Sequence, residues 1–113
     1  MALKEAEKRR FLRFPLNIPL HYKIRGAAEF GSSVTKDISV GGLRFVADKY
    51  ISPSSCVMLE FNLLSKIINP IGRVQWLQPL PHSNRYQMGL EFIELEIQSR
   101  NFLSDYINLR RNI

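Results

Sequence analysis

Apolar and polar residues alternate at period two along most of this chain, in short segments separated by turn-forming residues. In residues 18–24, Ile18, Leu20, Tyr22 and Ile24 fall on one face of an extended segment. Further strands are expected at about residues 29–36, 43–46, 56–63, 66–78 and 85–93. Glycine, proline and serine mark the turns between them, at residues 25–28, 41–42, 52–55 and 78–84. Several short strands with regular turns predict a small β-barrel or β-sandwich.

The C-terminal segment changes to a helical period. From about residue 96 to residue 111, the apolar side chains recur at helical spacing: Phe102, Leu103, Tyr106, Ile107 and Leu109. Arg110 and Arg111 lie where cations complement the carboxyl end of a helix. A C-terminal helix is therefore expected to pack its apolar face on the barrel.

Basic residues are concentrated at the N-terminus. Residues 1–25 hold seven lysines and arginines against Glu5 and Glu7, in a chain of 113 residues with a formal net charge of +6. Pro15 ends any helical pattern at or before Phe14. We expect a flexible basic tail over residues 1–14 and one folded domain over residues 15–113, with an anionic partner for the tail.

Catalytic and metal-binding groups are sparse. His21 falls on the outward face of the first strand and His82 in a proline-rich loop, and no Cys–His spacing resembles a zinc site. No glycine-rich phosphate loop of the Walker or Rossmann type is present. The chain is therefore expected not to be an enzyme, with no catalytic residues, no metal and no cofactor.

The cellular setting is constrained by what the sequence lacks. The single cysteine, Cys56, excludes an internal disulfide and lies in an apolar run that suggests a core position. No apolar stretch approaches the roughly 18 residues that span a bilayer, and the N-terminus lacks the apolar core of a signal peptide. We expect a cytoplasmic protein without membrane insertion.

Two motifs carry a resemblance to a known family. Arg9 and Arg13 form an Arg-x-x-x-Arg pair, and Asp37, Ser39 and Gly42 form an Asp-x-Ser-x-x-Gly motif. In this order and spacing they resemble the paired signature of PilZ domains, receptors for cyclic di-GMP. The segments 72–76 and 88–92 are also similar to late strands of that family, so the resemblance covers nearly the whole chain.

The resemblance implies a fold and a ligand. The fold is mainly all-β, a six-stranded antiparallel split β-barrel with a C-terminal α-helix, and the ligand is cyclic di-GMP. The implied ligand-binding residues are Arg9, Arg10, Arg13, Asp37, Ser39, Gly41 and Gly42, with Lys8 and Trp76 as further candidates.

The chemistry of these residue types fits that ligand. Arginine offers a planar fork of donors for phosphate or for guanine O6 and N7. An ionised Asp37 accepts hydrogen bonds, either from a guanine edge or from a tail arginine that it holds in place. Ser39 can donate to a phosphate oxygen or to guanine N7, while Gly41 and Gly42 permit positive φ and close approach of a ligand.

Several neighbouring side chains have two interpretations. Trp76 is either a half-buried aromatic of the barrel or a surface on which a purine stacks. Arg44 and Arg73 are candidates for contacts at the rim of the site, although a solvated face is the simpler expectation. Phe14, with Phe11 and Leu12, is expected to anchor the tail to the barrel.

The function expected from the resemblance is that of a ligand-gated adaptor. Cyclic di-GMP would change the conformation of the tail and so signal to an unidentified effector protein, in motility, exopolysaccharide or biofilm control. One alternative is a degenerate PilZ domain that only binds proteins. Another is a small nucleic-acid-binding barrel, although no DNA or RNA partner is expected because the basic residues lie in the tail.

Overall fold

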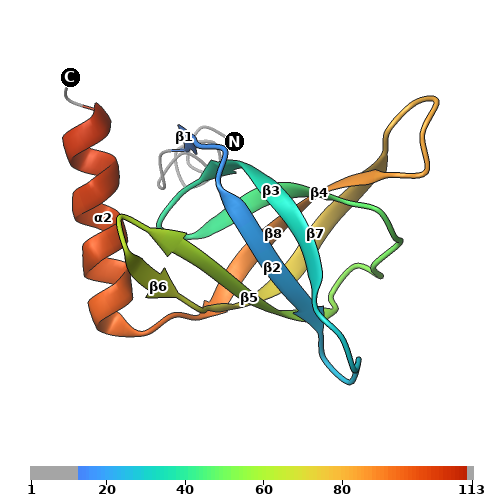
Figure 1. Cartoon of the computed structure of the whole chain (residues 1–113), viewed down its shortest axis with the longest axis horizontal. Helices are drawn as coiled ribbons and strands as arrows, with labels where there is room; N and C mark the ends of the chain where they lie inside the picture. The colour runs from blue at the N-terminus through green and yellow to red at the C-terminus, as the bar shows by residue number, and fades with distance from the viewer. Residues whose placement is uncertain (1–12, 112–113) are drawn as a thin grey trace, which may run out of the picture.

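The computed structural model describes residues 13–111, and the predictions that concern Lys8, Arg9 and Arg10 lie outside this range. The chain is mainly β, with one helix in the described part after the strands (Figure 1). The elements are β1 (Phe14–Pro15), β2 (Pro19–Ile24), β3 (Gly31–Ile38), β4 (Gly42–Ala47), β5 (Cys56–Leu63), β6 (Lys66–Ile68), β7 (Ile71–Pro79), β8 (Tyr86–Glu94) and α2 (Ile97–Arg111).

Six of these strands close into an antiparallel barrel, in the order β3-β2-β5-β7-β8-β4, with β4 pairing back to β3. The short β1 extends β3 through Phe14 opposite Ile38, and β6 adds to β5. This confirms the predicted six-stranded barrel. Closure leaves few free strand edges, because each barrel strand has a neighbour on both sides over part of its length.

The core follows from the alternation in the sequence. Leu20 and Tyr22 of β2 are buried while His21 between them is exposed, as predicted. The helix adds Leu103, Tyr106 and Ile107 to the same apolar cluster, so it packs on the barrel as expected. Each fully buried leucine or isoleucine stabilises the fold by roughly 1.5–3 kcal/mol.

The helix lies beside the end of the barrel that carries β1 and β6 (Figure 1). The rings of Phe14 and Tyr106 meet edge to face, with centroids 6.2 Å apart, and the Lys66 ammonium lies over the Phe102 ring. Phe14 thus holds the last residue of the predicted tail against the helix and β3, while Phe11 and Leu12, the other predicted anchors, lie outside the described residues.

The barrel is split between β3 and β4. The second half of β3 pairs with β4, through Thr35 opposite Phe45 and Ile38 opposite Leu43, with a register shift between Thr35 and Asp37. The first half, residues 31–34, pairs only with β2. One side of this half-strand therefore carries no strand in the described part of the chain.

Two local predictions were wrong. The strand expected over residues 66–78 is two strands, since β6 ends at Ile68 and β7 begins at Ile71. Pro70 lies between them and has no N–H to give to a ladder. Cys56 is only half-buried, because it begins β5 at an end of the barrel rather than in its core. No helix within residues 13–111 is long and apolar enough to cross a membrane.

Candidate functional site

Asp37 is the most constrained charged residue of the candidate site. It lies near the end of β3 and is 6% exposed. Its Oδ1 accepts a hydrogen bond from Arg13 Nη1 at 2.9 Å, and its Oδ2 pairs with Arg44 Nη2 at 2.8 Å. Of the two roles expected for Asp37, the structure has the one in which it holds an arginine from the N-terminal side.

Arg44 was considered for a contact at the rim of the site, with a solvated face as the simpler expectation, and its 38% exposed side chain is also held in an ion pair. Arg44 lies opposite Asp37 in the β3–β4 register, and its Nε is buried without a hydrogen-bond partner among the described residues. Because a nearly buried carboxylate needs a charged partner, Arg44 helps to fix Asp37 from the outer face of β4, where its side chain is 38% exposed. Arg13, whose side chain is 54% exposed, remains open to solvent on the other side.

Ser39 shapes the turn between β3 and β4. Its Oγ accepts hydrogen bonds from the Gly41 and Gly42 amides, both at 3.1 Å, and donates to the Gly42 carbonyl at 3.3 Å. The main-chain amide of Ser39 donates to the same carbonyl at 2.8 Å. The hydroxyl proton is thus engaged within the turn, and donation to a ligand requires the hydroxyl to rotate.

The two glycines of the motif do not use positive φ. Among the described glycines only Gly26 has a positive φ, of 90°, in the β2–β3 turn. Gly42 is needed for another reason, since a Cβ there would lie 2.0 Å from the Leu90 carbonyl oxygen of β8. The requirement for glycine at this position is therefore set by the close approach of β4 and β8.

An open cleft of about 180 Å³ lies beside this turn. The residues that line it come from the N-terminal segment, the turn and the adjoining strands: Arg13, Ser39, Gly41, Gly42, Gln75, Trp76, Gly89, Leu90 and Glu91. Four segments that are distant in sequence thus meet at one small surface. We call it the Trp76 cleft.

Trp76 is the half-buried aromatic of the barrel that the sequence suggested, and its role in stacking on a purine stays a prediction. Trp76 is 36% exposed and lies opposite Gly89 in the β7–β8 register. A Cβ at residue 89 would be 2.3 Å from the indole Nε1, so the missing side chain makes room for the indole to cover β8. The same ring lines the cleft and leaves part of its surface open for stacking.

Gln75 and Glu91 are members of the cleft that the sequence did not indicate. Gln75 Nε2 donates to Glu91 Oε1 at 3.2 Å across β7 and β8. Glu91 adds a carboxylate to the cleft that Arg13 also lines, so the cleft presents acceptors as well as donors. Nothing in the sequence indicated that Gln75 and Glu91 would meet, because the residues that face each other across two strands depend on the register of the strands.

A second cleft of about 330 Å³ lies next to the first and shares Gly41 and Glu91 with it. Its other lining residues are apolar except for Arg100, from the first turns of α2. Arg100 had not been expected at the site. Together with Arg13 and Arg44, it makes three cations within the described residues beside the Asp37–Gly42 motif.

The structure thus brings together Arg13, Asp37, Ser39 and Trp76 with the two glycines of the turn. Arg9, Arg10 and Lys8 lie outside the described residues, so their part in the site stays a prediction. Arg73 is exposed on β7 and lines neither cleft.

Comparison with known proteins gives a consistent picture. A family model described as the PilZ domain matches residues 7–109. An uncharacterized protein of Aquifex aeolicus is 30% identical over 106 residues, which are 93% of this chain and 50% of that protein. The chain therefore spans about half the length of that relative.

Solved structures share the fold at low sequence identity. The Bacillus subtilis inhibitor of motility MotI (DgrA) matches with a TM-score of 0.81 and 19% identity, over 92% of this chain and 51% of that one. The PilZ domain of Escherichia coli YcgR with c-di-GMP has a TM-score of 0.71, 13% identity and 93% coverage of both chains. The Borreliella burgdorferi PlzA protein in complex with c-di-GMP has a TM-score of 0.64 and 19% identity, over 93% of this chain and 43% of PlzA.

Proposed function

This chain belongs to the PilZ domain family, and on that premise we propose that it is a cyclic di-GMP receptor that acts as an adaptor toward a protein partner. One observation carries the proposal. The Trp76 cleft gathers an arginine, a flat aromatic ring and a serine–glycine turn from three distant segments. These are the groups that a ligand made of phosphates and guanines would use.

Arg13 is suited to bridge the ligand and the barrel. Its guanidinium has five N–H donors, and Asp37 engages one of its nitrogens, Nη1. Arg13 lines the same cleft as the Ser39 turn, and its remaining donors are the ones proposed to meet the ligand there. In this proposal Asp37 aims the guanidinium, and Arg13 binds a phosphate or the O6 and N7 edge of a guanine.

Trp76 is suited to stack on one guanine, since stacking of a base on an aromatic side chain contributes about 1–3 kcal/mol. A cleft of about 180 Å³ lies below the roughly 300–1,000 Å³ of most small-molecule sites. Cyclic di-GMP carries two guanines, so we propose that it extends beyond this cleft. The neighbouring cleft with Arg100 and the predicted contacts of Arg9 and Arg10 are the candidates for the remainder.

The ligand in two of the similar structures supports the choice of nucleotide. YcgR and PlzA were both solved with c-di-GMP. MotI is an inhibitor of motility, which supports motility among the processes that this chain could control, beside exopolysaccharide and biofilm formation.

The position of Arg13 supports the proposed adaptor role. The next residue, Phe14, packs on Tyr106 of α2 and pairs with β3. We propose that the ligand, by engaging Arg13 together with Arg9 and Arg10, changes the tail and the surface next to α2. A ligand shifts such an equilibrium only by its difference in affinity for the two states.

Isothermal titration calorimetry with cyclic di-GMP at moderate salt tests the proposal. We expect Arg13→Ala and Trp76→Ala each to weaken binding about tenfold or more, which corresponds to about 1.4 kcal/mol. Arg73→Ala is the matched control, because Arg73 is exposed on β7, the strand that carries Trp76, and lines neither cleft. It should bind as the wild type does.

Two results would overturn the proposal. A folded protein that gives no heat with cyclic di-GMP would favour a protein-binding domain without a nucleotide. Binding of single-stranded DNA that falls steeply with salt, and that is as tight as binding of cyclic di-GMP, would favour a nucleic-acid-binding barrel.

A further inference from the structure

The split of the barrel forms a second surface, which we call the seam. It consists of residues 31–36 of β3, residues 46–48 at the end of β4, and the facing part of the β7–β8 hairpin, residues 80–87. Its lining shares no residue with either cleft of the candidate site.

Backbone groups of β3 point into the seam. The Thr35 amide donates to the Ile18 carbonyl, so Thr35 faces β2. Because residues of an antiparallel strand alternate in the side to which they bond, the N–H and C=O groups of Ser32 and Val34 face away from β2. Pairing of β3 with β4 stops at Thr35, whose bridge to Phe45 occupies the Val34 carbonyl. The N–H and C=O groups of Ser32 and the amide of Val34 therefore face the seam without a strand partner among the described residues.

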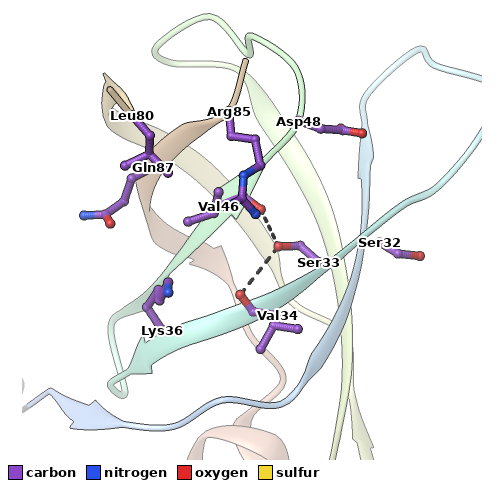
Figure 2. A pocket seen from close by; sticks show the side chains of 9 residues that line it. All are labelled: Ser32, Ser33, Val34, Lys36, Val46, Asp48, Leu80, Arg85 and Gln87. Carbon is purple, nitrogen blue, oxygen red and sulfur yellow. Dashed lines mark hydrogen bonds between the residues drawn. The ribbon is translucent and has the colours of Figure 1, made fainter. Parts of the chain in front are cut away.

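A side chain closes part of the gap. Ser33 Oγ donates to the Val46 carbonyl and lies 3.5 Å from the Val34 carbonyl, as Figure 2 shows. In a regular antiparallel ladder the Val34 amide would donate to the Val46 carbonyl. Here the Ser33 hydroxyl donates to that carbonyl instead. The Val34 amide is left available, and Val34 is 49% exposed.

The seam is hollow on its outer side. A cavity of about 380 Å³ lies over Val46, with Val34 and Lys36 of β3 on one side and Leu80 and Arg85 of the hairpin on the other. The Arg85 side chain extends toward the Ser33–Val46 contact (Figure 2). A volume in the usual range for small sites accommodates a few residues of an extended chain but no folded domain.

The charges of the cavity favour an anion. Lys36 and Arg85 lie on opposite sides of it, and neither lies within 4 Å of a carboxylate in the described part of the chain, where the ion pairs both involve Asp37. Asp48 is the one acidic residue of the lining. Its Oδ1 accepts a hydrogen bond from the Tyr22 hydroxyl at 3.4 Å.

We infer that the seam binds a short acidic segment of a partner protein in an extended conformation. The segment lies over Val46, its main chain bonds to the free backbone groups of β3, and its carboxylates meet Lys36 and Arg85. Small apolar side chains at alternate positions contact Val34 and Leu80. Main-chain bonds to a free strand edge supply affinity and the side chains supply specificity, as in other strand-binding domains.

Nuclear magnetic resonance with a synthetic peptide tests this inference. A blocked hexapeptide of alternating glutamate and valine is titrated into the 15N-labelled full chain. We expect saturable shifts of the Ser32, Val34, Val46 and Gln87 amides. The double variant Lys36→Glu, Arg85→Glu should bind about tenfold more weakly or worse, because two attractive contacts become repulsive.

Matched controls separate the possible outcomes. Arg73→Glu makes the same charge change on β7 and should leave peptide binding unchanged. Each variant is also titrated with cyclic di-GMP, which should bind as it does to wild type, so failure at the seam is distinct from failure of the proposed receptor function. The inference is overturned by absent shifts, by equal shifts with a lysine–valine hexapeptide, or by equal binding of glutarate alone, which would indicate a small dicarboxylate.

Discussion

Replacement of Gly42 by alanine should destabilise the barrel even without a ligand. The new Cβ would lie 2.0 Å from the Leu90 carbonyl oxygen and 3.2 Å from the Glu91 Cα. Both obstacles are backbone atoms of β8, held by the pairing of Gly42 with Glu91 and of Leu43 with Leu90. The two strands must therefore separate locally by about 1 Å, since real Cβ atoms are essentially never closer than 3.0 Å to such a neighbour.

The magnitude follows from what has to move. Overpacking of a well-packed interior typically costs about 1–3 kcal/mol. Backbone cannot rotate out of the way as a side chain does, and the adjacent bond from the Phe92 amide to the Gly41 carbonyl is strained with it. We expect a loss near the upper end, about 3 kcal/mol, and a fall in melting temperature of about 10–15 °C for a domain of this size.

Urea denaturation followed by circular dichroism measures this loss, and Gly89→Ala provides the contrast. There the nearest obstacle is the indole Nε1 of Trp76, at 2.3 Å, and a half-exposed side chain can swing aside. We expect a loss of only about 1 kcal/mol together with a change in the fluorescence of Trp76, the only tryptophan.

An unchanged urea midpoint for Gly42→Ala would refute the steric reasoning. If the loss is found, weaker cyclic di-GMP binding by this variant does not identify a ligand contact. The glycine of the Asp-x-Ser-x-x-Gly motif would then be required for the packing of β4 against β8 and not for contact with the ligand.

Two further changes test the electrostatics of the barrel. Arg44→Ala leaves the nearly buried Asp37 with one partner, and we expect about 1 kcal/mol lower stability in urea, while Arg73→Ala should have no effect. Burial and the neighbouring Asp48 raise the pKa of Tyr22 above its ordinary value of about 10. Since the folded state holds this proton more tightly than the unfolded state, its contribution to stability is complete below about pH 10 and is lost as the pH rises further. Tyr22→Phe should remove this alkaline loss in a series of unfolding curves against pH, and an unchanged pH dependence would contradict the assignment.

Much of the fold could be predicted because burial in a strand repeats every two residues. The alternation at Leu20 and Tyr22 marks the inner face of β2 without any knowledge of its neighbours. The break at Pro70 was missed because Ile67, Ile68 and Ile71 continue the apolar run across it. A proline within such a run was the signal that could have found it.

The site was harder to predict, since it depends on which residues face each other across strands. The partnership of Asp37 and Arg44 depends on a register shift between Thr35 and Asp37, which no spacing rule supplies. The contact of Gln75 with Glu91 likewise depends on an irregularity between Val74 and Trp76 of β7. Motifs indicated the turn and the arginine, but the register decides what surrounds them.

The contact of Phe14 with Tyr106 also fixes how this barrel can be joined to other domains. It brings the first described strand and the C-terminal helix to the same end of the barrel. A module fused before Arg13 or after α2 would therefore leave from neighbouring points, close to the arginine that pairs with Asp37. Fusions at either end would therefore report on the same movement. Two fluorophores, one attached at each end, would measure the change in distance between the N-terminal segment and α2 that the ligand is proposed to cause.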